Sequence, residues 1–299
     1  MGAVALSKAL NMSLPFGVKV LIIADAGGGK THSLRTLLAA GIQPFVLATE
    51  PGVRSLAPCE NTHCNVCAKT RDYGPDAIPW AYVAMNTGGI DLLIKQAADV
   101  NTKSQKMLCN IEDGMRKDYN QFGEVLQLTK NFVDHTGRSW GSPMEWNTDR
   151  AFVLDAATEL ANMAMAMYVG KRPVYDKPDY LVAQRMTYNY LHLITNSLRC
   201  HAVVLGHPDP QFNEAVGTVR ITMQSVGNKL SPQLPRKFDD VIIAKRVGTN
   251  FTWSTAEVNA EGKGRNLPIK ADMPQDFVPL IEGWKRAGGV IEPTPVETR

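Results

Sequence analysis

Long hydrophobic runs and a strong excess of one charge are both missing from this sequence. No apolar run approaches the eighteen or so residues of a membrane-spanning helix, so we expect no membrane-spanning segment. The formal net charge is only +3 over 299 residues, so the overall charge does not by itself indicate a nucleic-acid or membrane partner. Residues 1–17 lack a basic stretch followed by a long apolar one. We therefore expect no secretion signal and a cytoplasmic location.

Internal repeats and low-complexity tracts are also missing, which excludes solenoids and propellers. Cysteine is scarce and odd in number, with five residues in all. Three of them fall within residues 59–67, and in a chain without a secretion signal such clustering points to a metal before disulfides. The rest of the composition, 44% apolar and 20% charged, is typical of a globular protein.

Apolar segments of strand length alternate with helical patterns as far as residue 207, which predicts an α/β fold with a mostly parallel central sheet flanked by helices. The expected strands are 18–23, 44–49, 80–85, 151–154 and 202–206, and the expected helices are 31–40, 90–100, 112–133, 158–169 and 180–198. Three shorter strands, 219–223, 241–246 and 251–255, should extend the sheet with antiparallel pairing before a closing helix at 276–286. We expect a single domain over 1–299, with a Cys-rich insertion at about 58–79 and a helical insertion at about 103–135.

A glycine-rich loop between the first expected strand and the first expected helix is the clearest motif. Residues 24–31 read ADAGGGKT, and the last three fill the final positions of the P-loop pattern G-x-x-x-x-G-K-[ST]. Ala24 stands where the first glycine is usual, but the three glycines still let the backbone approach phosphates closely. The residues expected to bind the nucleotide are Ala26, Gly27, Gly28, Gly29, Lys30, Thr31 and His32, with Lys30 on the β- and γ-phosphates and Thr31 on Mg²⁺.

Three further polar residues follow buried strands whose carboxyl ends should meet at the same edge of the sheet. Asp155 ends the run AFVLD and is predicted to help hold Mg²⁺, although a helix N-cap is its alternative role. Glu50 follows PFVLAT and is the expected base for the attacking water, with a solvated loop acid as the alternative. His207 follows AVVLG and is the expected sensor of the γ-phosphate, or otherwise a turn histidine.

With these motifs in place, the chain resembles RecA-like P-loop ATPases, and most of all the small phage-encoded members associated with single-strand annealing and recombination. The matching segments are ADAGGGKT, VLATEPG, AFVLDAATEL, AVVLGH and LPRKFDDVIIAKR, with a weaker match at KGRNLP. The resemblance implies ATP hydrolysis with Mg²⁺ in recombination, annealing or replication, single-stranded DNA as a partner, a homo-oligomer, and the host cytoplasm for a phage protein. It also implies that Lys263 and Arg265 reach the nucleotide of the next subunit, on a flexible loop that points outward.

The Cys-rich insertion contains the run CENTHCNVC at residues 59–67. Its C-x-x-C spacing and third thiol predict a possible Zn²⁺ site with Cys59, His63, Cys64 and Cys67 as ligands. Because His63 adjoins Cys64, a distant residue such as Cys109 is an alternative fourth ligand. A redox pair and plain reduced cysteines are the two competing interpretations.

The competing functions differ in what the nucleotide does. The first is an ATP-hydrolysing recombination or annealing protein, and the second is a DNA-binding or assembly module that ATP binding gates with little turnover. A small-molecule kinase is disfavoured because no arginine-rich lid follows a helix. A concentration of basic residues in the last third of the chain, Lys229, Arg236, Lys237, Lys245, Arg246, Lys263 and Arg265, suits DNA, a neighbouring subunit or a solvated face.

Overall fold

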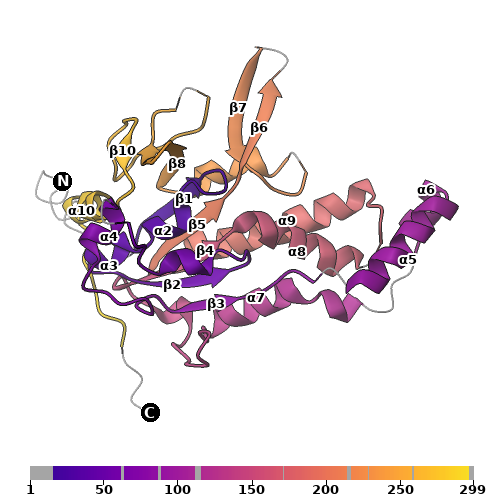
Figure 1. The fold of residues 1–299 in the computed structure, drawn as a ribbon, viewed down its shortest axis with the longest axis horizontal. Coiled ribbons are helices and arrows are strands. Elements are labelled where there is room, and N and C mark those ends of the chain that lie inside the picture. The colour runs from indigo at the N-terminus through magenta and orange to yellow at the C-terminus, as the bar shows by residue number, and fades with distance from the viewer. Residues whose placement is uncertain are drawn as a thin grey trace, which may run out of the picture.

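A sheet of eight strands in the order β10-β9-β8-β1-β5-β4-β2-β3 forms the centre of the structure (Figure 1). The computed structural model describes residues 16–61, 64–86, 89–111, 116–170, 172–213, 217–227, 229–257 and 259–295. Six neighbouring strands, from β8 to β3, run parallel, and β9 and β10 add antiparallel pairs at one edge. The strands are β1 (Lys19–Ile23), β2 (Gln43–Ala48), β3 (Trp80–Tyr82), β4 (Arg150–Asp155), β5 (His201–Gly206), β8 (Asp240–Val247), β9 (Asn250–Ser254) and β10 (Met273–Pro274).

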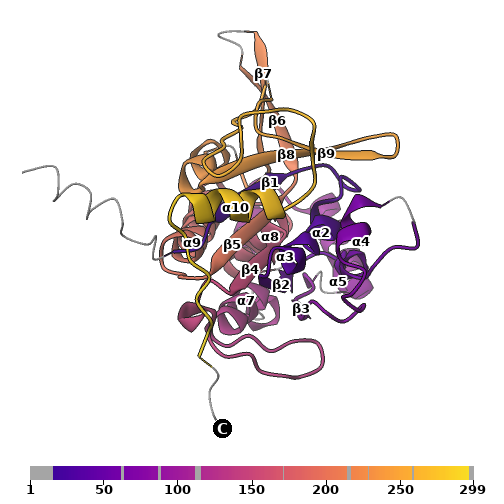
Figure 2. The ribbon, with the colours of Figure 1, turned by 90° about the vertical axis from the view of Figure 1, so that its left-hand side faces the viewer.

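Helices cover both faces of this sheet, which confirms the predicted α/β class. On one face α7 (Gln121–Lys130), α8 (Ala157–Val169) and α9 (Lys177–Asn196) enclose one apolar core. On the other face α3 (Thr36–Ala39) and α10 (Val278–Arg286) enclose a second, together with Leu34, which follows the short α2 (Lys30–Ser33). Figure 2 shows α10 and α3 in front of the strands. The central strands are apolar on both sides because alternate residues enter alternate cores: Leu21 and Ile23 face the first core, and Val20 and Ile22 the second.

The segment between β2 and β3, residues 49–79, contains η1 (Val53–Leu56) and α4 (Asn65–Lys69). The name Cys-rich insertion refers from here on to this whole segment, which begins before the expected residue 58. A buried arginine of the P-loop segment holds it in place: Arg35 donates hydrogen bonds to the backbone oxygens of Leu56, Thr70 and Tyr73. At the far end of the molecule, α5 (Gly89–Thr102) and α6 (Gln105–Cys109) project away from the sheet (Figure 1). No helix in the described ranges is long and apolar enough to cross a membrane.

The helix predicted over 112–133 is wrong as a single element. A short 3₁₀ turn, η2 (Arg116–Tyr119), is followed by Asn120 and then by α7, which ends at Lys130; residues 112–115 lie outside the described ranges. Phe132 is buried but belongs to a loop, where its backbone N–H bonds to Gly141. Both η2 and α7 bury apolar side chains, so the spacing of apolar residues correctly indicated a buried face. It did not show that the helix breaks between the two elements.

The predicted antiparallel extension of the sheet is only partly correct. The strand β8 pairs with β1 in parallel, and the antiparallel pairing begins one strand later, between β8 and β9. The strand expected at 219–223 does not join this sheet at all: β7 (Thr218–Met223) pairs with β6 (Pro208–Asn213) in a separate hairpin that projects from the body (Figure 1). Two prolines in β6 obscured it, because proline argues against a strand in a sequence pattern.

Candidate functional site

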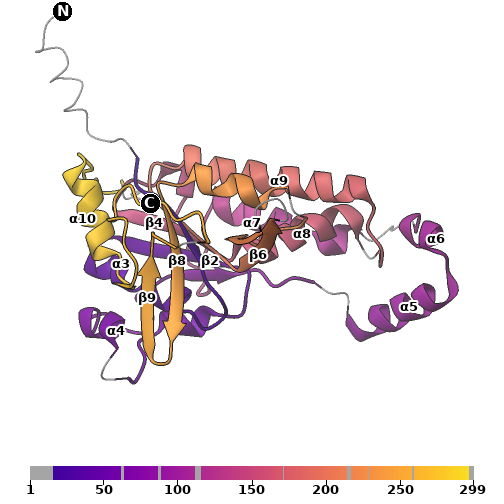
Figure 3. The same cartoon turned by 90° about the horizontal axis from the view of Figure 1, so that it is seen from above.

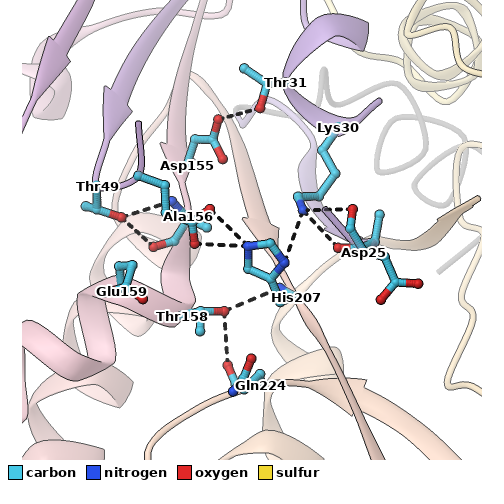
Figure 4. Close-up of polar contacts among 12 residues, drawn as sticks. Asp25, Lys30, Thr31, Thr49, Asp155, Ala156, Thr158, Glu159, His207 and Gln224 are labelled. Atoms are coloured by element: carbon cyan, nitrogen blue, oxygen red, sulfur yellow. Dashed lines mark hydrogen bonds and ion pairs between the residues drawn. The ribbon is translucent and has the colours of Figure 1, made fainter. Parts of the chain in front are cut away.

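Four parallel strands deliver the predicted site residues to one edge of the sheet. The strand β1 leads into the glycine-rich loop, β2 into Glu50, and β5 into His207, while Asp155 is the last residue of β4. The register aligns these ends, because Asp155 lies opposite Ala48 of β2 on one side and Leu205 of β5 on the other. Residues more than a hundred positions apart in the sequence therefore face one another (Figure 4).

The Lys30 side chain folds back over the glycine-rich loop. Its ammonium Nζ donates to the backbone oxygen of Ala24 at 2.8 Å and lies 3.5 Å from both the Asp25 oxygen and His207 Nδ1. Only 7% of the residue is exposed. Burial lowers the pKa of Lys30, while the negative charge of the nearby Asp155 opposes that shift. The loop thus holds one desolvated cation at the edge of the sheet.

The Thr31 hydroxyl donates a 2.6 Å hydrogen bond to a carboxylate oxygen of Asp155 (Figure 4). Asp155 is almost fully buried, and burial raises its pKa. Behind this pair, Thr49 clamps β2 to β4, since its hydroxyl donates to the Ala156 oxygen and accepts from the Ala156 N–H. A hydroxyl and a carboxylate held in contact are the oxygen donors that Mg²⁺ prefers.

Glu50 and His207 form a second pair beside the lysine. His207 Nε2 lies 3.0 and 2.9 Å from the two carboxylate oxygens of Glu50, and each side chain is 24% exposed. If Nε2–H donates to Glu50, the free lone pair on Nδ1 can accept from Lys30, so a single tautomer satisfies the whole chain of contacts. The backbone N–H of His207 donates to the Thr158 hydroxyl at 3.3 Å, which fixes the backbone at this strand end.

Two glycines of the loop adopt backbone conformations that other residues rarely take. Gly27 has φ +75° and Gly29 φ +86°, both in the left-handed region. A Cβ at Gly29 would also collide with Gln275 and Phe251. Without side chains at these positions, the backbone of the loop itself lines the adjoining cavity. Ala24 can replace the usual first glycine because its backbone is not in the left-handed region; Asp272 is the one non-glycine residue with a positive φ in the described ranges.

A cavity of about 1120 Å³ opens over this loop. The β8–β9 hairpin closes it on one side with Arg246 and Phe251, and the Cys-rich insertion closes it on the other with Arg54, Pro58 and Asn61. Figure 3 shows the hairpin and α4 next to each other at this end of the molecule. The volume suffices for a nucleotide with its phosphates, given that most small-molecule sites have about 300–1,000 Å³.

Three cysteines and a histidine meet at the wall of the same cavity. The Sγ atoms of Cys59, Cys64 and Cys67 and one ring nitrogen of His32 all lie within 4.8 Å of one another. We call these four residues the His/Cys cluster. Three thiols and an imidazole are a donor set typical of tetrahedral Zn²⁺ sites, so the cluster could hold such a metal.

Three of the four predicted ligands, all of them cysteines, belong to the cluster. The three cysteines come together as expected, but the fourth member of the cluster is His32, from the first turn after the P-loop, whose side chain turns towards the insertion. His63 lies outside the described residues. The alternative ligand Cys109 ends α6, at the opposite end of the molecule from α4 (Figure 1).

The loop with Lys263 and Arg265 is exposed, but it makes more contacts than the flexible loop that we expected. Lys263 exchanges two backbone hydrogen bonds with Val241 near the start of β8, and its Nζ donates to the Phe238 oxygen. The Arg265 guanidinium pairs with Asp239 at 3.0 Å. The flanking glycines, Gly262 and Gly264, permit close backbone contact rather than mobility, because a Cβ at either would collide with a carbonyl group. This loop lies at the opposite strand end from Lys30.

Sequence reasoning missed several residues that line or support the site. Gln275 is buried and donates to the Gly28 oxygen at 2.8 Å, so it ties the C-terminal segment to the glycine-rich loop. Arg54 and Phe251 line the cavity. None of these residues sits in a recognisable local motif, and Gln275 is 247 positions from its partner.

Comparison with known protein families found no family model that matches the chain, and no curated protein matches its sequence.

Proposed function

We propose that the chain binds and hydrolyses ATP with Mg²⁺ at the edge formed by β1, β2, β4 and β5. The observation that carries the proposal is the 2.6 Å contact between Thr31 and Asp155, next to a buried lysine and two glycines in the left-handed conformation. These are the parts that phosphate and metal binding require: backbone N–H groups, one cation, and two oxygen ligands. The cavity above them supports the proposal with space for a nucleoside.

The side chains of Lys30, Thr31 and Asp155 are chemically suited to a nucleotide and its metal ion. Bound MgATP would supply the reactive phosphorus and the metal charge that offsets its oxygens. Lys30 would exchange its bond to the Ala24 carbonyl for phosphate oxygens, and Thr31 and Asp155 would turn their oxygens to the metal. Phe251, at the wall of the cavity, would offer its aromatic ring to the adenine base of the nucleotide.

Glu50 is the residue best placed to accept a proton from an attacking water. Its carboxylate is partly exposed, and it follows β2 at the same edge as the lysine. His207 orients that carboxylate by contacting both of its oxygens, and the same ring contacts Lys30 through its other nitrogen. If Lys30 moved on phosphate binding, the His207 ring would lose or change its contact with Lys30, and the orientation of the Glu50 carboxylate would change with it.

We further propose the RecA-like class, a homo-oligomer and single-stranded DNA as partner, on the strength of the sequence resemblance. Lys263 and Arg265 lie too far from their own glycine-rich loop, at the opposite end of β8, to act on the same subunit's nucleotide. They suit the proposed contact with a neighbouring subunit only if Arg265 leaves Asp239. The ATPase rate with and without single-stranded DNA, at two salt concentrations, tests the partner.

The Glu50→Gln variant tests hydrolysis separately from binding. General base catalysis contributes about 10²–10⁴-fold, so we expect the ATPase rate to fall by about that factor while ATP affinity is kept. Glu124→Gln, on an exposed position of α7, is the matched control and should keep the parent rate. A Glu50→Gln protein that hydrolyses ATP like its parent would remove Glu50 from the reaction. A parent that binds ATP without turnover would favour the ATP-gated module instead.

A further inference from the structure

The His/Cys cluster has the internal geometry of a metal site. His32 Nε2 lies 3.3 Å from Cys64 Sγ and 3.4 Å from Cys67 Sγ, and the Cys59 and Cys67 sulfurs are 3.5 Å apart. A tetrahedral ion with Zn–S bonds of about 2.3 Å separates its ligand atoms by slightly under 4 Å. The sulfurs are too far apart for disulfides, and all three cysteines are free thiols.

A second contact prepares the histidine for a metal. His32 Nδ1 lies 2.9 Å from the backbone oxygen of Ser55, and this carbonyl can only accept. The Nδ1–H therefore donates to Ser55, and the lone pair of Nε2 points towards the three sulfurs. Metal-bound histidines commonly donate their other ring N–H to a carbonyl in this way. Ser55 belongs to η1, so the insertion both orients the histidine and supplies the thiols.

The four ligands come from two segments with different roles. His32 directly follows Thr31, the residue in contact with Asp155, whereas the cysteines belong to the insertion that walls the cavity. Cys59 and Cys64 line the same cavity as Lys30. A metal in the cluster would thus join the start of the helix after the P-loop to the cavity wall, over a sequence distance of up to 35 residues.

We propose that the cluster is a structural zinc site that His32 completes, and that zinc occupancy strengthens nucleotide binding by fixing the P-loop helix against the wall of the cavity. The coupling rests on the proposed nucleotide site, whereas the zinc assignment does not. Bound zinc restricts the motion of the insertion before the nucleotide binds. Less conformational entropy is then lost on ATP binding, so the metal-loaded protein binds ATP more tightly. Coupling between two binding sites is reciprocal, so ATP should also slow the loss of zinc to a chelator.

The insertion should stay folded without the metal. Arg35, which is fully buried, holds it through carbonyl oxygens at both ends, and Lys69 forms an ion pair with Asp276 on the other side of α4. Removal of zinc is therefore expected to loosen the contact between the insertion and His32, not to unfold the chain. This makes the metal-free protein usable in a binding experiment.

The first measurement is the metal content of the purified full chain. We expect about one zinc per chain, no zinc in Cys67→Ser, and full zinc in Cys109→Ser, the matched control from α6. His32→Ala should retain the three thiols but hold zinc at least about tenfold more weakly. A parent chain without zinc, or with iron in its place, would overturn the assignment, as would a His32→Ala protein with unchanged zinc affinity.

The second measurement is ATP affinity by calorimetry for zinc-loaded, chelator-stripped and zinc-reloaded parent protein. We expect stripping to weaken ATP binding about five- to 150-fold, the usual range of coupling between sites, and reloading to restore it. Cys67→Ser should behave like the stripped parent; it is the preferred variant because Cys67 is buried and does not line the cavity. Equal affinity in the loaded and stripped states would overturn the coupling and leave the nucleotide site intact. A loaded parent that binds no ATP would instead refute the proposed function, with the zinc site unaffected.

Discussion

Thr31 and His32 are neighbours in the chain, yet their side chains contact different groups at the start of the helix. The Thr31 hydroxyl reaches Asp155 at 2.6 Å, and the His32 imidazole reaches Cys64 and Cys67 at 3.3 and 3.4 Å. Successive residues of a helix point about 100° apart, so one turn can serve two sites. The candidate nucleotide site and the His/Cys cluster therefore share one short piece of backbone.

Asp155→Asn is predicted to lose Mg²⁺-dependent ATP hydrolysis while some nucleotide binding remains. The amide keeps the shape of the side chain and can still accept from Thr31, but it lacks the negative charge that attracts the metal. The measurement is the ATPase rate as Mg²⁺ is titrated, with Asp118→Asn as the exposed control. Full activity of Asp155→Asn at the Mg²⁺ concentration of the parent would place the metal ligand elsewhere.

Gly29→Ala is predicted to damage the glycine-rich loop more than a backbone penalty alone would. Gly29 and Gly137 have nearly the same left-handed φ, +86° and +85°, but only Gly29 would bring a Cβ against Gln275 and Phe251. Left-handed alanine costs about 1–2 kcal/mol, which both variants should lose in free energy of unfolding. The further loss in Gly29→Ala, together with weakened ATP binding, measures the crowding at the loop. Equal stability and ATP affinity in the two variants would show that the loop can move aside.

Protein stability is predicted to fall as the pH drops below about 6.5, in a way that depends on His201. Burial lowers the pKa of His201 to about 3, with the charge of Lys19 adding to the effect. Its ring accepts from the Val18 N–H and lies 3.0 Å from the Thr148 oxygen, so the folded state holds it neutral. Between pH 6.5 and 3 the unfolded chain binds a proton that the folded chain does not, which costs up to about 1.4 kcal/mol per pH unit.

Denaturant unfolding of the parent and of His201→Gln at pH 7.5, 6.5 and 5.5 checks this dependence. The variant will be less stable at every pH, so the comparison is between slopes and not between absolute values. We expect the parent to lose more stability than the variant on going from pH 6.5 to 5.5. Parallel curves for the two proteins would show that His201 contributes nothing to the pH dependence.

The strands that carry the candidate site could be predicted because their signals are local. Apolar runs such as VKVLII and AFVL bury both faces of a parallel strand, and the polar residues that follow them mark the edge where the strands end. Knowing that parallel strands end at one edge was then enough to predict that Glu50, Asp155 and His207 would approach the P-loop.

The features of the site that could not be predicted depend on contacts between segments that no local sequence pattern connects. His32 joins the cysteines only because Arg35 and Ser55 place the insertion beside its helix. Gln275 reaches the glycine-rich loop across 247 residues. The loop at residues 261–266 seemed mobile from its glycines, whereas those glycines allow close backbone packing. Glycine has both uses, and only the neighbouring chain decides between them.

The most direct test of the proposed nucleotide site is ATP binding by Lys30→Ala, measured by calorimetry in the presence of Mg²⁺. Lys30 makes its contacts with loop carbonyls and His207 rather than with the apolar cores, so the variant should stay folded, with zinc content and unfolding midpoint close to those of the parent. Lys130→Ala, at the exposed end of α7, is the control. We predict that the parent and Lys130→Ala bind ATP and that Lys30→Ala shows no measurable binding. A folded Lys30→Ala protein with the ATP affinity of the parent would contradict the assignment of the nucleotide site.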